Sequence, residues 1–296
     1  MTTKIFLVDG TYEVFRHHYG VPQKVRERGS RRAAARGVVG SVLGLLEEGA
    51  THVGVATDHV IESFRNQMWA GYKDGTGVPE DLAAQFPVLE DALEAMGVVV
   101  WAMVDLEADD ALASGAAVAG EDDRVDQVVI CTPDKDLAQC VVGDRVVQLD
   151  RRRGTTMDEA GVRAKFGVEP TSIPDWLALV GDSSDGYPGL KGWGAKAAAA
   201  VLRRYHHLED IPRLGERWEV AVPGARALAN TLHEHRELAF LFRDLATLRV
   251  DRSLLADVAA LRWAGPTARF AVVSEELGAP RLAERAEALA TTRAAP

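Results

Sequence analysis

The first half of the chain alternates between short apolar runs and longer segments with apolar residues at helical spacing. The runs at residues 4–8, 51–56, 98–104 and 126–132 are rich in β-branched residues and predict buried strands. Between them, apolar residues recur every third or fourth position over 37–48 and 79–96, and an Ala-rich segment extends to residue 119. Strands separated by helices of this length indicate an α/β domain with a mostly parallel sheet.

The second half of the chain has a different pattern. From about residue 157 the strand patterns fade, and helices are predicted from residue 158 and over 173–180, 195–204 and 225–245. We therefore expect a catalytic α/β domain at residues 1–165, a helical domain at 166–252 and a helical C-terminal extension at 253–296, to which the sequence assigns no chemistry.

Composition narrows the class of protein. The chain has 296 residues, of which 47% are hydrophobic and 26% charged, as expected of a folded globular protein. No apolar run approaches the roughly 18 to 20 residues of a membrane span. Cys131 and Cys140 are too few for a disulfide framework, and the N-terminus begins with a strand pattern instead of a signal peptide, so a cytoplasmic location is expected. The net charge of -10 opposes nucleic-acid binding unless the negative charge is concentrated in one place.

Acidic residues follow the predicted strands repeatedly. A single Asp after a strand is most often the N-cap of the next helix. Acids at four strand ends are too many for capping alone, and ligands of open parallel sheets bind beyond the carboxyl ends of the strands. Two more acids follow the apolar helix that ends near residue 180. The set comprises Asp9, Asp58, Glu107, Asp109, Asp110, Asp134, Asp136, Asp182 and Asp185.

Carboxylates gathered in one cleft repel one another unless cations neutralise them. Hard divalent ions such as Mg²⁺ or Mn²⁺ prefer oxygen ligands, and no Cys/His cluster has the spacing of a zinc site. Two such ions about 4 Å apart are the usual means of phosphodiester hydrolysis. Metal-dependent phosphodiester cleavage is therefore the leading reaction class.

A Gly-rich segment in the second half has features of a phosphate-binding turn. Gly189, Gly192 and Gly194 allow close approach of a ligand, and the following helix N-terminus directs amide groups toward it. Lys191 and Lys196 add positive charge; the alternative is a helical hairpin with glycine caps. A basic stretch over residues 24–36 fits a DNA contact or a solvated loop equally well. Lys73 and Arg65 follow the strand that ends near Asp58, where a cation could reach a phosphate.

Six motifs follow one another along the chain: Leu7–Gly10, Ser63–Arg65, Gly71–Lys73, Leu106–Ser114, Thr132–Gln139 and Gly181–Gly194. Together they resemble the motifs of the 5′ nuclease family, which includes the 5′→3′ exonuclease domain of bacterial DNA polymerase I, stand-alone bacterial exonucleases and flap endonucleases. With a seventh match at 246–251, the resemblance covers residues 4–252, and the absence of a polymerase region after it favours the stand-alone form. It implies a PIN-like sheet flanked by helices, followed by a helix-three-turn-helix DNA-binding region.

The resemblance also implies roles for single residues. Asp9, Asp58 and Asp109 match the ligands of a first metal ion, with Glu107 between two ions. Asp134, Asp136 and Asp185 match the ligands of a second ion, while Asp110 and Asp182 would act mainly through bound water. Lys73 matches a lysine that contacts the reacting phosphate, Arg16 an arginine near the 5′ side, and Phe15 an aromatic residue that stacks on a base. Residues 189–196 match the duplex-holding turn, which often binds K⁺ through loop carbonyls.

Two positions depart from the family pattern. Thr76 replaces an arginine that usually follows the Gly-Tyr-Lys motif, so either the transition-state charge is stabilised less or another base, such as Arg65, substitutes for it. Gly186 replaces an asparagine, which removes an amide but no metal ligand. We expect an active monomeric enzyme that acts on 5′-flap, nicked or branched DNA. The alternatives are a PIN-type ribonuclease and a non-catalytic protein that binds DNA junctions. The nine motif carboxylates account for most of the excess negative charge, so the rest of the chain is close to neutral.

Overall fold

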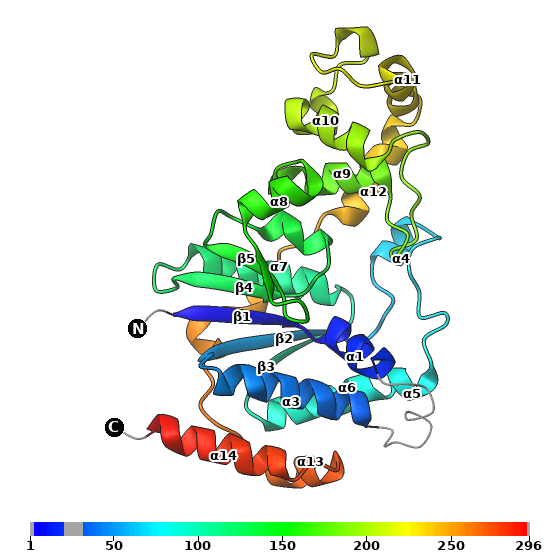
Figure 1. The fold of residues 1–296 in the computed structure, drawn as a ribbon. Coiled ribbons are helices and arrows are strands. Elements are labelled where there is room, and N and C mark those ends of the chain that lie inside the picture. Colours follow the sequence, from blue (N-terminus) through cyan, green and yellow to red (C-terminus); the bar gives the residue numbers. More distant parts are fainter. Residues whose placement is uncertain (1–2, 21–31, 295–296) are drawn as a thin grey trace. The chain divides into compact units, whose positions relative to one another are not determined.

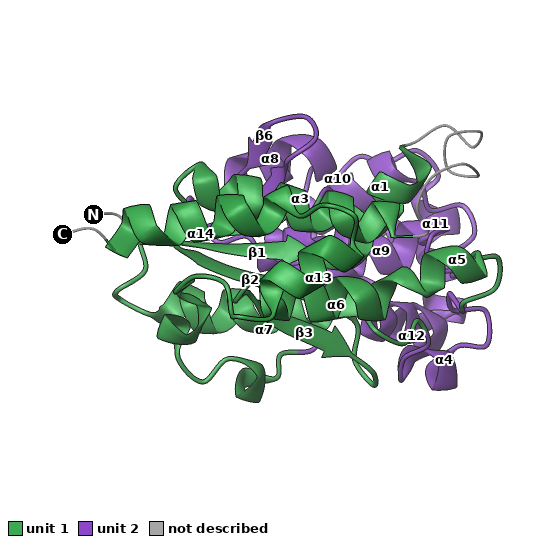
Figure 2. Ribbon diagram, turned by 90° about the horizontal axis from the view of Figure 1, so that it is seen from below, with its two compact units in different colours: residues 1–61, 75–132, 250–296 green, residues 62–74, 133–249 purple. Residues whose placement is uncertain are grey.

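The computed structural model describes residues 3–20 and 32–294 (Figure 1). The chain forms two compact units, each made of segments distant in sequence (Figure 2). Unit 1 comprises residues 1–61, 75–132 and 250–296, and unit 2 comprises residues 62–74 and 133–249. None of the helices in the described part of the chain is long and apolar enough to cross a membrane.

The sheet of unit 1 confirms the predicted parallel α/β architecture. Its strands are β1 (Lys4–Asp9), β2 (His52–Asp58), β3 (Val99–Met103) and β4 (Gln127–Cys131). They lie in the order β3-β2-β1-β4, and each neighbouring pair is parallel. Their carboxyl ends therefore lie at one edge of the sheet, where Asp9 is the last residue of β1 and Asp58 the last of β2.

Helices cover the sheet of unit 1 in layers (Figure 1). Helix α7 (Ala108–Glu121) contacts all four strands. Its small residues allow a close approach: a Cβ atom at Gly115 would lie 3.0 Å from the Trp101 ring and 3.3 Å from Leu7. This packing fixes the acidic N-terminus of α7 beyond the strand ends. The other helices of this layer arrangement are α1 (Gly10–Tyr19), α3 (Ala33–Glu47), α5 (Glu80–Ala83) and α6 (Gln85–Ala95).

The helix predicted over 79–96 is divided in two, and Pro87 gives the reason. A proline has no N–H to donate to the carbonyl four residues earlier, here that of Ala83, where α5 ends. Helix α1 was not predicted from the sequence. It begins directly after β1, and the Asp9 carboxylate caps its first turn.

The C-terminal extension belongs to unit 1. Helix α13 (Phe270–Glu276) packs on α6, and α14 (Arg281–Ala294) packs on α3. Side-chain hydrogen bonds join the C-terminal extension to earlier segments of unit 1. Trp263 Nε1 donates to Met96 O over 2.8 Å, and Arg32 Nη1 donates to Glu276 O over 2.8 Å. Arg32 is the start of the described part of the basic stretch; residues 24–31 lie outside the described residues.

Unit 2 is mainly helical. An antiparallel hairpin, which the sequence did not predict, joins β5 (Val146–Asp150) to β6 (Thr155–Met157). The helix predicted over 225–245 is broken at His235, because its halves pack on different elements. Helix α11 (Ala225–Glu234) packs on the short turn Gly215–Arg217, and α12 (Arg236–Ala246) packs on α9 (Ile173–Val180). The helices are α4 (Arg65–Met68), α8 (Glu159–Phe166), α9 (Ile173–Val180), α10 (Ala195–Tyr205), α11 (Ala225–Glu234) and α12 (Arg236–Ala246).

Candidate functional site

Two carboxylates at the ends of β1 and β2 are held by hydrogen bonds within unit 1. Asp9 accepts from Tyr12 N and from Thr132 Oγ1, each over 2.8 Å, and Asp58 accepts from Ala108 N over 2.7 Å. Both side chains are buried. The orientation of these carboxylates is therefore set by the fold before any ligand binds.

The N-terminus of α7 carries the other acids of unit 1. Glu107 caps the helix and forms a reciprocal capping box with Asp110, whose Oδ2 accepts from Glu107 N over 3.0 Å. Asp110 is fully buried, and Asp109 is half-buried. The capping interpretation is thus correct for Asp9 and Glu107. Because each carboxylate oxygen has two acceptor positions, capping leaves room for a cation.

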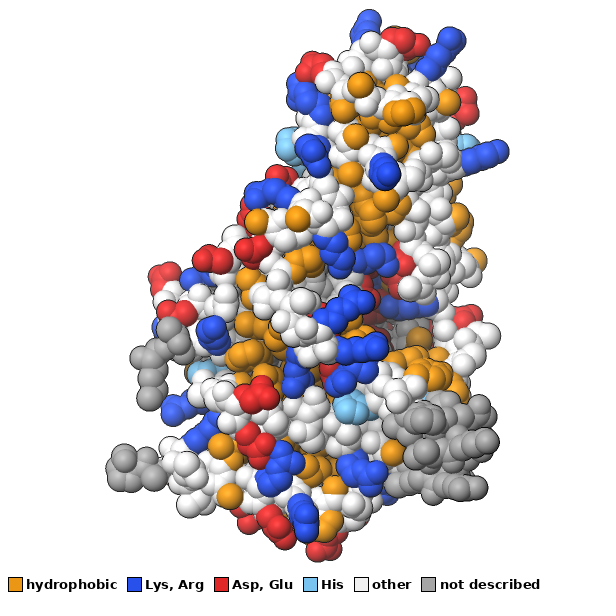
Figure 3. Space-filling view, in the orientation of Figure 1, with side chains coloured by type: hydrophobic (Ala, Val, Ile, Leu, Met, Phe, Trp, Pro, Cys, Tyr) orange, Lys and Arg blue, Asp and Glu red, His pale blue; other side chains and the backbone are white. Residues whose placement is uncertain are grey.

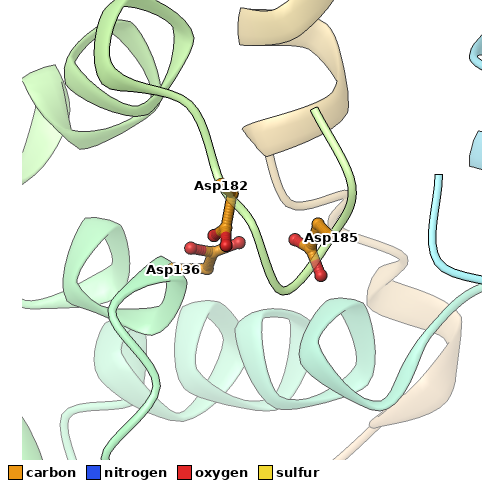
Figure 4. Close-up of side chains that lie close together, drawn as sticks. All are labelled: Asp136, Asp182 and Asp185. Atoms are coloured by element: carbon orange, nitrogen blue, oxygen red, sulfur yellow. The ribbon is translucent and has the colours of Figure 1, made fainter. Parts of the chain in front are cut away.

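Three carboxylates of unit 2 converge on one point (Figure 4). Asp136 begins the 3₁₀ turn Asp136–Cys140, whereas Asp182 and Asp185 lie on the loop between α9 and α10. One ligand atom from each lies within 4.8 Å of the others. Asp182 and Tyr187 exchange two backbone hydrogen bonds, of 2.8 and 3.0 Å, which close this loop and hold both of its acids on one side.

The environment of Asp136 fits a hard divalent cation. Its Oδ1 is buried and has no hydrogen-bond partner, and a buried polar atom left unpaired is costly. Burial, and then the charges of Asp134, Asp185 and Asp182, raise the pKa of Asp136 well above its ordinary value. A cation at this point would satisfy the unpaired oxygen and offset the repulsion, so the residues present suit Mg²⁺ or Mn²⁺.

Two lysines lie against this carboxylate group. Lys135 Nζ forms an ion pair with Asp182 Oδ2, and Lys73 Nζ lies 3.4 Å from Asp185 Oδ1. Burial acts to lower the pKa of Lys135, but the hydrogen bond to Asp182 and the nearby carboxylate charges outweigh it, so the pKa is raised. Asp134 is exposed and joins the group indirectly, by accepting from Asp136 N over 3.0 Å.

The structure corrects the expectation that Arg65 contacts a phosphate. Its side chain is 1% exposed, its Nε donates to Leu245 O over 2.8 Å, and its Nη2 donates to Thr247 O over 3.2 Å. A guanidinium committed to backbone carbonyls in the interior of unit 2 cannot take the place of the arginine that Thr76 replaces. Arg65 instead anchors the 62–74 segment to the end of α12.

Arg65→Met is expected to lower the free energy of unfolding by about 2 to 3 kcal/mol, because it leaves buried carbonyls unsatisfied. Urea unfolding followed by circular dichroism measures the loss. Arg226→Met is the matched control, since that side chain is 83% exposed and its removal should cost less than about 0.5 kcal/mol. Unchanged stability together with lost catalysis would restore the catalytic role of Arg65.

The departure at Gly186 has a steric explanation. Its φ is +82°, and a Cβ atom there would lie 2.0 Å from Gly71 O. The loop with the acids thus approaches the 62–74 segment too closely for asparagine. Lys73 N donates to Asp185 O over 3.0 Å, and Trp69 Nε1 donates to Gly186 O over 3.1 Å, so the same contact sets the position of Lys73.

The Gly-rich turn presents its lysines to solvent. Lys191 and Lys196 are exposed, and Gly189 and Gly192 have positive φ, whereas a Cβ at Gly194 would meet open space. Trp193 points inward and donates to Leu228 O over 3.3 Å. Figure 3 shows an apolar surface in the part of unit 2 that carries α10 and α11, with both basic and acidic side chains around it. A shallow hollow there is lined by Gly192, Gly194, Ala195, Lys196, Ala197, Ala200, Ala221, Val222 and Pro223.

The last two predicted site residues, Phe15 and Arg16, lie on helix α1. Phe15 is half-buried, and its ring packs edge-on against that of Phe86, with 6.4 Å between the centroids. Arg16 forms an ion pair with the buried Glu13 and lies 3.0 Å from His17 Nε2. The exposed fraction of the Arg16 side chain is 28%, so its guanidinium is held on the helix yet partly reachable from solvent.

Lys135, which forms an ion pair with one of the three converging carboxylates, was not among the predicted site residues. The sequence signal for it is its place between Asp134 and Asp136, where a positive charge alternates with two negative ones. Conversely, Asp182 was expected to act through water, whereas its carboxylate lies in the converging group and Asp134 does not. A sequence places these acids in the same region but does not order them by distance.

Fold and site define an α/β protein with carboxylate groups suited to hard divalent cations, joined to a helical unit with an exposed basic turn. The family model described as "5′-3′ exonuclease, N-terminal resolvase-like domain" matches residues 4–167, and that of the "C-terminal SAM fold" matches residues 168–269. The chain therefore belongs to the 5′-3′ exonuclease family.

Two similar proteins support the same assignment. The 5′-3′ exonuclease of Aquifex aeolicus is 31% identical over 243 residues, which cover 81% of this chain and 82% of that protein. DNA polymerase I of Pseudomonas aeruginosa is 32% identical over 280 residues, 91% of this chain but only 30% of the polymerase. The chain thus spans about a third of the length of the DNA polymerase I relatives that it matches.

Solved structures share the fold. The flap endonuclease of bacteriophage T5, in a complex with DNA and metal ions, is 21% identical, with a TM-score of 0.66 over 97% of this chain and 99% of that one. The catalytic core of Rad2 in complex with a DNA substrate is 15% identical, with a TM-score of 0.65 over 97% of this chain and 91% of that one. At these identities the likeness establishes the fold alone.

Proposed function

We propose that the protein is a Mg²⁺- or Mn²⁺-dependent 5′ nuclease that hydrolyses DNA phosphodiester bonds at 5′ ends and at 5′-flap or branched junctions, in replication and repair. The observation that carries the proposal is the converging group Asp136, Asp182 and Asp185, in which a buried carboxylate oxygen has no hydrogen-bond partner. Family membership supports the reaction class, because relatives are named 5′-3′ exonucleases.

Two carboxylate sets would hold two ions. Asp9, Asp58, Asp109 and Glu107 would hold the first, with Asp110 orienting Glu107 through the capping box. Asp136, Asp182 and Asp185 would hold the second, with Asp134 orienting Asp136. When bound, the ions activate a water molecule for attack and neutralise the charge that develops on the phosphate.

The protein's own side chains would position the DNA. The Lys73 ammonium, held near Asp185, would contact the phosphate that is cut, and Arg16 would contact the 5′ side of the strand. The exposed part of the Phe15 ring would stack on a base. In-line attack on the phosphorus from the side opposite the 3′ oxygen leaves the phosphate on the 5′ end of the product.

The turn at residues 189–196 would hold duplex DNA by its backbone. Its lysines are exposed at the start of α10, where the helix N-terminus adds unpaired amide groups that favour phosphate. Loop carbonyls in this turn are candidate ligands of K⁺. Because these contacts involve phosphates and not bases, binding would depend on DNA structure and salt instead of sequence.

Lys191→Ala with Lys196→Ala is expected to weaken binding of flap DNA and to reduce the steepness of its salt dependence. If both lysines contact phosphates, the slope of log K against log salt concentration becomes shallower by about 1.8. Fluorescence anisotropy across a salt series, with Ca²⁺ in place of Mg²⁺, measures the slope. The control is Lys165→Ala, an exposed lysine of α8, which should leave the slope unchanged. Equal slopes for all variants would remove the turn from the DNA interface.

The substrate class is tested by offering the wild-type chain three substrates with Mg²⁺. We expect cleavage of 5′-flap DNA, little cleavage of intact duplex, and no preference for single-stranded RNA. Preferential cleavage of the RNA would favour a PIN-type ribonuclease. Binding of the flap without cleavage, with either Mg²⁺ or Mn²⁺, would favour a junction-binding protein.

Three further assignments belong to the same proposal. Residues 1–165 would form the catalytic domain and 166–252 the DNA-binding domain, with 253–296 as a structural extension. We propose that the protein acts as a monomer, because the proposed contacts with metal and DNA all come from one chain. We also propose a cytoplasmic location, which is consistent with cysteines present as thiols.

A further inference from the structure

Lys135 has an unusual position among the charges of unit 2. It stands between Asp134 and Asp136 in sequence, and its Nζ forms an ion pair with Asp182 from the α9–α10 loop. The Lys135 side chain is 31% exposed and that of Asp182 is 3% exposed. Ion pairs shielded in this way are weakened less by solvent than surface pairs.

This ion pair occupies an oxygen that a metal ion would need. Asp182 Oδ2 is bound by Lys135, and Asp182 Oδ1 accepts from Ser184 N over 2.9 Å. A divalent ion that uses Asp182 must either displace the ammonium or share its oxygen. Sharing places like charges close together, which disfavours the bound state.

The charges of the group also differ in how they are compensated. Lys135 lies against Asp182 and Lys73 against Asp185, whereas Asp136 Oδ1 is buried without a hydrogen-bond partner. Lys73 already has a proposed contact with phosphate. Lys135 has none, and its motif neighbours hold it beside the carboxylates.

We propose that Lys135 is an internal counter-ion of the Asp136–Asp182–Asp185 group, which keeps the acids together before metal binds and then competes with the metal ion. The inference rests on the proposed function, because it assumes a divalent ion at this group. Lys135 is thus a positioning residue that sets metal affinity. Lys135 keeps the affinity for the divalent ion lower than the carboxylates alone would give, and it keeps the α9–α10 loop folded when no metal is bound.

The test is Mn²⁺ binding to the full chain without DNA, with free Mn²⁺ measured by electron paramagnetic resonance. Lys135→Met removes the charge and keeps the length of the side chain, and should bind Mn²⁺ at this group about tenfold more tightly. Lys135→Arg keeps the charge and should stay close to the wild-type affinity. Lys165→Met is the matched control, an exposed lysine of the same unit, and should leave the affinity unchanged.

Asp185→Asn shows whether the measured Mn²⁺ ion binds at the Asp136–Asp182–Asp185 group, because loss of this carboxylate should reduce the number of bound Mn²⁺ ions. A second readout is thermal unfolding: Lys135→Met should unfold at a lower temperature without metal and gain more from Mn²⁺ than the wild type. Unchanged or weaker Mn²⁺ binding by Lys135→Met would overturn the proposal, as would an unchanged ion count in Asp185→Asn. Flap cleavage by the wild type is a separate experiment, so failure here is distinguishable from failure of the proposed nuclease function.

Discussion

Replacing Asp136 and Asp185 together by Asn is expected to slow cleavage of 5′-flap DNA by about a thousandfold or more, because a metal ion supplies several kcal/mol of transition-state stabilisation. Asn keeps the size of each side chain and removes its charge. Both positions belong to the converging group, whereas the exposed Asp134 does not. Single-turnover cleavage in saturating Mg²⁺ measures the chemical step without product release.

This double variant must be separated from one that is merely unfolded. Removing two of the mutually repelling charges should relieve strain in the metal-free group, so the variant should remain folded by circular dichroism. Asp210→Asn is the matched control, an exposed acid of unit 2 outside the group, and should cleave at the wild-type rate. A folded double variant with wild-type activity would remove the metal site from the mechanism.

Phe242→Ala is expected to lower the free energy of unfolding by about 3 to 5 kcal/mol, the cost of a large cavity in a core. The Phe242 ring is fully buried. It stacks on Tyr187 with 5.4 Å between centroids and meets Trp69 edge-on at 5.2 Å. Phe242 thus packs against both the loop that carries Asp182 and Asp185 and the 62–74 segment. Urea unfolding, with tryptophan fluorescence as the probe, measures the change.

Phe240→Ala is the control for this cavity, since Phe240 lies on the same helix but is only half-buried. Its removal should cost less than half as much, because fewer contacts are lost. Cleavage by Phe242→Ala should fall with stability and recover in part when the temperature is lowered. A loss below about 1 kcal/mol would show that the loop does not depend on this core.

The strands of unit 1 and the position of its acids could be predicted from the sequence, because both follow from local patterns. The apolar run before Asp9 predicts a buried strand, and parallel strands bring their carboxyl ends to one edge of the sheet. The hairpin β5–β6 could not be predicted, because β6 has only three residues, of which two are exposed, and so lacks a strand pattern. The break at His235 was missed because it depends on two separate packing partners, which periodicity cannot show.

Burial argues against a phosphate contact for Arg65. Arg65 lies in a motif beside a lysine with a proposed phosphate contact, so its position in sequence favoured a similar role. Its partners are the carbonyls of Leu245 and Thr247, about 180 residues away, which the motif does not reveal. Long-range contacts of this kind also place Lys135 against Asp182 and explain why Gly186 stands where asparagine is usual.

The most direct test of metal-dependent nuclease activity is cleavage of a 5′-flap DNA by the wild-type chain before metal removal, after treatment with EDTA, and after Mg²⁺ is restored. A metal-dependent 5′ nuclease should release the flap only with Mg²⁺, leave a 5′ phosphate on the newly formed end of the downstream strand, lose all activity in EDTA, and recover it with Mg²⁺. Cleavage that persists in EDTA, or flap DNA that is bound but never cut with Mg²⁺ or Mn²⁺, would contradict metal-dependent nuclease activity.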